Sequence, residues 1–309
     1  MYVYRGFHRS LPLTPASVVT LGNFDGVHLG HAAMLARLRQ LGQQHGLPTV
    51  VLTFEPHPRE FFAPNAAPAR LTTLREKLEL LAEHAVECVN ICRFNAAFSR
   101  LSAAEFVEQV LVNSLHVKHL LVGDDFRFGA GRQGDFAFLQ AAGEKYGFSV
   151  EAIRSVVNAG GERVSSSAVR QALAAGDMDL ATQLLGRHYA MDGNVVHGDK
   201  IGRQLGFATA NIRIKHNPLP LAGVFAVEVV GIGAEALAGV ANLGTRPTLG
   251  GMRTLLEVHL FDFAQDIYGK HLRVNFLHKL RNEQRFPNFD ALKAQIARDA
   301  AEARAYFQR

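Results

Sequence analysis

The feature that most constrains the fold of this chain is a change of rhythm near residue 185. Up to that point, short apolar runs rich in β-branched residues, such as Ser17 to Leu21 and Thr49 to Phe54, alternate with amphipathic stretches. This alternation is typical of βαβ units and of a parallel sheet. Beyond Arg187 the apolar runs are separated by Gly, Pro and Asn, which is typical of an antiparallel barrel. The 309 residues therefore predict two domains, 1–185 and 186–309.

Several elements can be placed within this frame. In the first half we expect helices after Gly30, from Thr72 and after the capping box of Ser102 and Glu105, and a strand at Leu120 to Val122. Asp177 to Leu185 is predicted as a helix that joins the halves. The barrel strands are predicted at Val224 to Val230, Ala238 to Leu243, Thr254 to Phe261 and Leu272 to Leu277, and a final helix at Phe289 to Tyr306 is expected to pack along the barrel.

The charge balance favours small anionic ligands over nucleic acid. Thirty-three Lys and Arg against 28 Asp and Glu give a net charge of +5, less than the clustered charge of a dedicated nucleic-acid binder. No stretch approaches the ~18 apolar residues of a membrane helix, and the N-terminus lacks the apolar core of an export signal. We expect a cytoplasmic protein with small-molecule partners, no nucleic-acid or membrane partner, and a monomeric or weakly homo-oligomeric state.

The two cysteines, Cys88 and Cys92, stand in and directly after the apolar run Val86 to Ile91. A zinc site would need a second pair of ligands, which is missing, so we interpret both as small core residues. Their use fits a reducing compartment.

A glycine-rich turn between the first strand and the first helix predicts a phosphate site. It reads Gly22-Asn23-Phe24-Asp25-Gly26-Val27-His28-Leu29-Gly30-His31. Glycines let the backbone approach a ligand closely, and the helix start offers N–H groups and a positive dipole end. His28 and His31 can both face the phosphate and stabilise charge that grows in a transition state. The alternative is a pair of surface histidines.

Three further segments could complete that site. Arg163, Ser166, Ser167 and Arg170 form a second phosphate clamp of hydroxyls and guanidinium groups at a helix start; the alternative is a serine cap beside a solvated arginine. Asp125 follows an apolar strand, where open α/β sheets place ligands, and Phe126 or Phe128 could flank a flat ring. The run Phe54-Glu55-Pro56-His57-Pro58 leaves another strand end and could line the same crevice, or its prolines could simply stiffen a loop.

The second half contains its own candidate site. The stretch from Gly193 to Asn211 is glycine-rich without being a P-loop, and Lys200 and Arg203 bring charge to it. Thr209 and Asn211, two apart on a predicted strand, could hold Mg²⁺ with ATP oxygens, or be part of a polar barrel face. Glu257 stands in an apolar strand, where it is either a base beside a substrate hydroxyl or an outward-facing strand residue.

Together these segments resemble the bacterial bifunctional riboflavin kinase/FAD synthetase family over nearly the whole chain. The HxGH pattern of His28 to His31 is similar to that of nucleotidyltransferases. The resemblance implies a Rossmann-like nucleotidyltransferase domain followed by a riboflavin kinase β-barrel with a C-terminal helix. It assigns Gly22 to His31, Asp125 and Arg163 to Arg170 to FMN adenylylation. It assigns to riboflavin phosphorylation the residues Glu257, Gly198, Lys200, Gly202, Arg203, Gly206, Phe207, Thr209, Asn211, Asn242, Gly244 and Arg281.

The resemblance also implies the chemistry. Riboflavin and ATP give FMN and ADP with Mg²⁺, and FMN and a second ATP give FAD and pyrophosphate. Two positions depart from the family, since Ala208 replaces the usual Pro and Ser167 the usual Thr. One alternative is a flavin- or nucleotide-binding regulatory protein without turnover. Another is a tRNA-directed nucleotidyltransferase, although no anticodon-binding module or dense basic face is evident.

Overall fold

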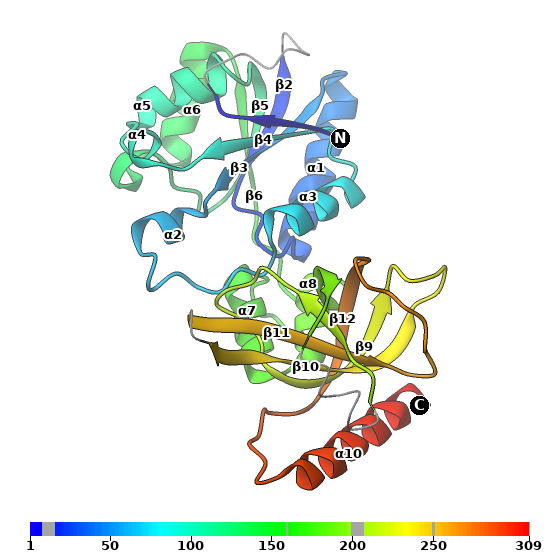
Figure 1. Ribbon diagram of the computed structural model, residues 1–309. Coiled ribbons are helices and arrows are strands. Elements are labelled where there is room, and N and C mark those ends of the chain that lie inside the picture. The colour runs from blue at the N-terminus through cyan, green and yellow to red at the C-terminus, as the bar shows by residue number, and fades with distance from the viewer. Residues whose placement is uncertain (8–15, 159, 199–206, 249–250, 309) are drawn as a thin grey trace. The chain divides into compact units, whose positions relative to one another are not determined.

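The computed structural model describes residues 1–7, 16–158, 160–198, 207–248 and 251–308. The chain divides into two compact units, which Figure 1 draws. The first comprises Met1–Pro68 with Lys77–Val164, and the second comprises Ala69–Glu76 with Ser165–Arg309. None of the helices in the described ranges combines the length and apolar character needed to cross a membrane.

The first unit contains a parallel sheet with the strand order β1-β4-β3-β2-β5-β6. Neighbouring strands in it are parallel, as predicted from the alternating rhythm. The strands are β1 (Tyr2–Arg5), β2 (Ser17–Leu21), β3 (Thr49–Glu55), β4 (Cys88–Arg93), β5 (Val117–Gly123) and β6 (Ser149–Ile153). The helical segments between them are α1 (Leu29–His45), α2 (Pro58–Phe62), α3 (Leu74–Glu83), α4 (Ala96–Ser99), α5 (Ala103–Glu105) and α6 (Phe136–Tyr146).

Continuous burial explains the sheet. Every residue of β2 is buried, as expected for a parallel strand covered on both faces. Cys88 and Cys92 pack in the same core and form no disulfide, which confirms their interpretation as core residues. The predicted capping box is also present: Ser102 accepts from the Glu105 backbone N–H, and the Glu105 carboxylate accepts from that of Ser102. The helix it starts continues as a π-helix over Phe106–Val112.

The second unit contains a closed barrel with the strand order β10-β11-β8-β7-β12-β9. Neighbouring strands in it are antiparallel, which confirms the predicted antiparallel barrel. The strands are β7 (Tyr189–Val196), β8 (Ala210–Arg213), β9 (Gly223–Val230), β10 (Leu237–Thr248), β11 (Gly251–Leu260) and β12 (His271–Arg281). The helices α7 (Ser166–Ala175), α8 (Met178–Leu185) and α10 (Phe289–Phe307) complete the unit.

The final helix α10 covers the outer face of the barrel, as predicted. Asn288 caps its first turn by accepting from the Ala291 backbone N–H. Ala300 and Ala303 pack into one cluster with Val224 and Val240 of β9 and β10. Because these alanine side chains are small, the helix can pack closely against the strands.

One prediction about the barrel is wrong in detail. Thr209 was expected on a strand with Asn211, but β8 begins at Ala210, so Thr209 lies just before it. The preceding residues belong to the glycine-rich stretch, which carries no apolar alternation that would extend the strand.

The segment Ala69–Glu76 is bound to the barrel by buried polar contacts. The Glu76 carboxylate accepts from the backbone N–H of Thr73 at 2.6 Å and of Asp192 at 2.8 Å, and lies 3.3 Å from Nε2 of His216. The His216 side chain is fully buried and that of Glu76 is 6 % exposed. A buried carboxylate is tolerated only when its oxygens are satisfied in this way, so this segment is specified by polar as well as apolar contacts.

Candidate active sites

The turn between β2 and α1 has the tight geometry that its glycines predict. Phe24, Gly26 and Val27 all have positive φ angles, of 48°, 82° and 39°. Such values are costly for Phe and Val, and strain of this kind is concentrated at functional sites. The turn delivers His28 to the N-cap of α1, where its Nδ1 accepts from the His31 backbone N–H at 3.3 Å. Because Nδ1 is the acceptor, the neutral His28 ring carries its proton on Nε2 and can donate it to a ligand.

The two predicted histidines lie together. Their rings stack with centroids 3.7 Å apart and an interplanar angle of 15°, and His28 is only 6 % exposed. A Cβ on Gly30 would lie 3.1 Å from Cε1 of His28, so glycine leaves room for that ring. Phe24 and Asp25 are buried under the turn. An imidazole pair at a helix N-terminus suits a phosphate, and this arrangement excludes the reading of two independent surface histidines.

A cavity of about 800 Å³ lies within the first unit. Gly22 and Asp125 line it, as the sequence predicted, together with Phe126 and Phe128, whose rings are stacked 5.7 Å apart. Phe54, from the run predicted to leave another strand end, also lines the cavity. Further aromatic side chains from distant segments were not predicted; they are Phe62, Phe94, Phe98 and Phe106. No short-range pattern marks them, because they converge only when the strand ends meet. The cavity is suited to a flat aromatic ring system.

The remaining predicted residues of this unit have definite contacts. Arg163 donates to the Asp125 carboxylate at 2.6 Å, and both side chains are more than half exposed, so the pair can rearrange around a ligand. His57 caps α2: its Nδ1 accepts from the Arg59 backbone N–H, and Glu60 accepts from that of His57. Its neighbours Pro58 and Arg59, rather than His57 itself, are among the residues that line the cavity.

Ser166, Ser167 and Arg170 lie at the start of α7, as predicted for a helix N-terminus. Ser165 is the cap residue and accepts from the Ala168 backbone N–H. The Arg170 Nε donates to the Ala69 carbonyl at 2.6 Å. These residues belong to the second unit, and their role in binding phosphate stays a prediction.

In the barrel, three predicted residues form one row across adjacent strands. Glu257 of β11 pairs with Asn242 of β10 on one side and with Asn211 of β8 on the other. Directly paired residues point to the same face of a sheet. Their neighbours Leu256 and Val258 fill the barrel interior with exposures of 0 % and 1 %, so Glu257 lies on the outer face, half-buried.

Two cavities border this row. One of about 630 Å³ is lined by Phe207, Thr209, Asn242, Glu257 and Arg281, and by side chains of α10. The other, of about 270 Å³, is lined by Gly198, Thr209 and Asn211 and by residues of the segment 263–268. Thr209 lines both cavities, so two ligands, one in each cavity, could contact each other beside its side chain. Glu257 therefore faces outward from its strand and also borders a cavity, so the two interpretations of this residue, an outward-facing strand glutamate and a base beside a substrate, are compatible.

Arg281 forms a bidentate ion pair with Asp299, a residue that the sequence did not indicate. Its Nε and Nη2 donate to the two oxygens of Asp299, at 2.8 and 2.7 Å, and Gln295 Nε2 donates to the same carboxylate at 2.8 Å. The side chains of Arg281 and Asp299 are 16 % and 5 % exposed. This pair fixes α10 beside the larger cavity, and only the fold brings β12 and α10 together.

Two predicted glycines are positions where a side chain would strike a site residue. A Cβ on Gly198 would overlap the side-chain amide of Asn211, and one on Gly244 would overlap the carboxylate of Glu283. Lys200, Gly202, Arg203 and Gly206 lie outside the described residues.

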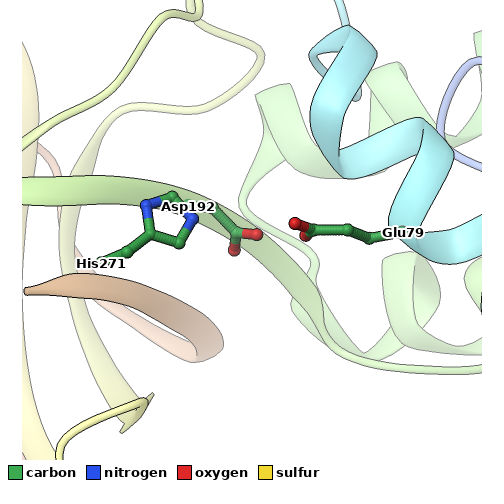
Figure 2. Close-up of side chains that lie close together, drawn as sticks. All are labelled: Glu79, Asp192 and His271. Atoms are coloured by element: carbon green, nitrogen blue, oxygen red, sulfur yellow. The ribbon is translucent and has the colours of Figure 1, made fainter.

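Figure 2 shows Asp192 of β7 and His271 of β12 with Glu79, which belongs to the other unit. Each of the two barrel side chains has a partner on the other's strand. Asp192 accepts from Arg273 Nε at 3.3 Å, and His271 Nδ1 lies 2.8 Å from Asn194 Oδ1. The Nε2 of His271 is buried without a hydrogen-bond partner. Because the third side chain belongs to the other unit, we assign no metal-binding role to this group.

Two family models match the chain. The FAD synthetase model matches residues 12–168, and the riboflavin kinase model matches residues 185–307. The first covers the loop of His28 and the cavity of the first unit, and the second covers the barrel with Glu257.

Full-length relatives agree with both models. Proteins named bifunctional riboflavin kinase/FMN adenylyltransferase are 53 % identical in Escherichia coli K12 and 50 % identical in Haemophilus influenzae, with 99 % of this chain and at least 98 % of each relative covered. A crystal structure called a macrolide-efflux protein, from Streptococcus pneumoniae, is 28 % identical with a TM-score of 0.82 over 97 % of both chains. The chain belongs to the bifunctional riboflavin kinase/FMN adenylyltransferase family.

Proposed function

We propose that the chain makes FAD from riboflavin in two reactions at two separate sites. The barrel, residues 186–309, transfers the γ-phosphoryl group of ATP to riboflavin, and residues 1–185 transfer the adenylyl group of a second ATP to FMN. The observation that carries the proposal is that each unit has its own cavity bordered by the residues predicted for its reaction, Glu257 in one and Asp125 in the other. We place both reactions in the cytoplasm, where the two buried thiols stay reduced.

In the kinase reaction the riboflavin 5′-hydroxyl attacks the γ-phosphorus. The new O–P bond forms as the bond to the β-phosphate oxygen breaks, and ADP leaves. Glu257 orients the hydroxyl and accepts its proton, while Asn242 and Asn211 flank it on the neighbouring strands. The larger barrel cavity takes the flavin and the smaller one the nucleotide, which brings the two reactants together at Thr209.

The donors at this site suit Mg²⁺. Thr209 and Asn211 offer neutral oxygen atoms at the smaller cavity, and oxygen is the ligand type that Mg²⁺ prefers. The close packing of Gly198 on the Asn211 amide leaves that side chain little freedom. When bound, Mg²⁺ neutralises charge on the ATP phosphates.

In the adenylyl transfer the FMN phosphate attacks the α-phosphorus of ATP, and pyrophosphate leaves as the α–β bond breaks. The attacking phosphate is already an anion, so no general base is needed. His28 donates through Nε2–H to the oxygens on which charge grows, and the His31 ring stacked on it holds its orientation. Asp125 and the aromatic cavity bind the flavin nucleotide.

Two substitutions test the proposal, and each reaction serves as the control for the other. Glu257→Gln keeps the size of the side chain and should lower kcat for riboflavin phosphorylation by roughly 10²- to 10⁴-fold, leaving FAD formation from supplied FMN unchanged. His28→Asn keeps a cap acceptor for α1 but removes the Nε2–H. It should lower FAD formation by roughly 10²- to 10³-fold and leave FMN formation unchanged. Parallel loss of both activities in either variant would contradict two independent sites.

A further inference from the structure

His259 is a residue of the barrel site to which the reaction above gives no role. It stands two residues after Glu257 on β11, so both side chains point to the same face of the strand. It is half-buried and lines the larger barrel cavity with Glu257 and Asn242. A ring nitrogen of His259 attaches it to another segment of the site.

That attachment is a hydrogen bond to the backbone before β8. The Nδ1 of His259 lies 2.8 Å from the carbonyl oxygen of Ala208. A carbonyl oxygen can only accept, so Nδ1 carries the proton and the bond exists in both the neutral Nδ1–H form and the cation. Ala208 is the residue directly before Thr209.

The backbone of Ala208 and Thr209 lies outside the β8–β11 strand pairing. The pairing of β8 with β11 runs from Ile212–Leu256 to Ala210–Val258 and ends there. Continued by one residue, it would place Thr209 opposite His259, but the chain leaves the sheet at that point. The side chain of His259 therefore supplies a bond at the place where backbone pairing stops.

Aromatic packing fixes the ring that makes this bond. The ring of His259 meets that of Phe207 edge to face, with centroids 5.4 Å apart and an angle of 85°, and that of Phe261 at 5.9 Å and 75°. Phe207 and Phe261 both pack in the cluster formed with α10. Such edge-to-face pairs restrict the ring to one orientation, so Nδ1 stays aimed at Ala208.

We propose that His259 is a positioning residue of the kinase site, which acts by anchoring the Ala208 carbonyl and thereby the side-chain oxygen of Thr209. This inference rests on the proposed riboflavin phosphorylation in the barrel. Thr209 is the side chain that lines both the flavin cavity and the nucleotide cavity. Loss of the bond to Ala208 leaves the backbone beside Thr209 less well fixed, which weakens the binding of Mg²⁺–ATP. Glu257 and its strand neighbours keep their positions because strand pairing holds them.

Substitution of His259 by residues with a side-chain amide distinguishes the effect of losing the hydrogen bond from the effect of changing the packing. In His259→Asn the amide nitrogen occupies a position close to Nδ1 and can still reach Ala208. In His259→Gln the amide lies one bond further out, and His259→Phe keeps the ring without any donor. His278 offers a matched control because it is an exposed barrel histidine stacked on Tyr306, 5.3 Å away, outside the residues that line either cavity.

The experiment measures KM for Mg²⁺–ATP and for riboflavin in the kinase reaction of the full chain, with FAD formation from FMN as the folding control. We expect His259→Phe and His259→Gln to raise KM for Mg²⁺–ATP by about fivefold, as for the loss of one neutral hydrogen bond. His259→Asn and His278→Phe should behave like the original protein. The proposal is overturned if His259→Asn loses as much as His259→Gln, if the change falls on KM for riboflavin instead, or if His259→Phe changes neither. Absence of riboflavin phosphorylation in the unsubstituted protein would refute the proposed function itself, a distinguishable result.

Discussion

Gly198→Ala gives a direct measure of how precisely Asn211 must be placed. The Cβ that alanine adds would lie 2.5 Å from Oδ1 of Asn211 and closer still to the rest of that amide. A carbon and an oxygen atom in ordinary contact are about 3.5 Å apart, so the amide has to move by about 1 Å. Displacement of a positioning group by about 1 Å can cost roughly 100-fold in rate. Asn211 is 9 % exposed and is paired with Glu257, so the displacement reaches the row that we propose carries out the kinase reaction.

The assay compares kcat/KM for Mg²⁺–ATP in riboflavin phosphorylation between Gly198→Ala and Gly233→Ala. A Cβ on Gly233, in the same unit, would meet no atom within 4 Å, so this control carries the same chemical change without the collision. We expect a loss of about 100-fold for Gly198→Ala and none for Gly233→Ala, with FAD formation from FMN unchanged in both. Equal kcat/KM values for the two variants would refute the reasoning, because Asn211 would then tolerate displacement or take no part.

Three further predictions concern stability, reactivity and the nucleotide site. Burial works to raise the pKa of Glu76, but His216 and the backbone N–H groups around the carboxylate outweigh it and hold that pKa below its usual value. The stability this gives is present at neutral pH and lost as pH falls through the folded pKa, so Glu76→Gln should flatten the acid side of the stability profile measured by urea unfolding. Burial raises the pKa of Cys88 to about 11 and that of Cys92 to about 12; iodoacetamide at pH 8 should therefore label both in urea but neither in the native protein, as read by mass spectrometry. Asp125→Asn removes an exposed ion pair, so the melting temperature should not change measurably while FAD formation falls; a shift in melting without loss of activity would count against its placement at the site.

The site residues that could be predicted from the sequence are those whose arrangement depends only on neighbouring residues in the chain. His28, Gly30 and His31 fall within one turn of chain, and the cap bond, the ring stack and the space above Gly30 are all set by that turn. The helix start and the strand before it are likewise decided by neighbours in sequence. Such a motif can be read without knowing the rest of the fold.

The parts that were missed depend on contacts between distant segments. Asp299 is one of several acidic residues on α10, and only its meeting with Arg281 of β12 distinguishes it from the others. The cavity of the first unit also includes the rings of Phe62, Phe94 and Phe98, which lie outside every motif that the sequence indicated. His259 was visible in the sequence, but its bond to Ala208 follows from the point at which β8 leaves β11.

The register of the barrel decides whether Glu257 can act at all. A slip of one residue would exchange the faces of β11 and send the carboxylate into the interior that Leu256 and Val258 now fill. An unpaired carboxylate there would cost several kcal/mol, and the apolar side chains would be exposed in its place. The correct register is therefore favoured by the packing of the barrel itself, and it is the same register that sets Asn211 and Asn242 on either side of Glu257. The apolar alternation along β11 thus specifies the position of the carboxylate that we propose as the base as strictly as it specifies the core.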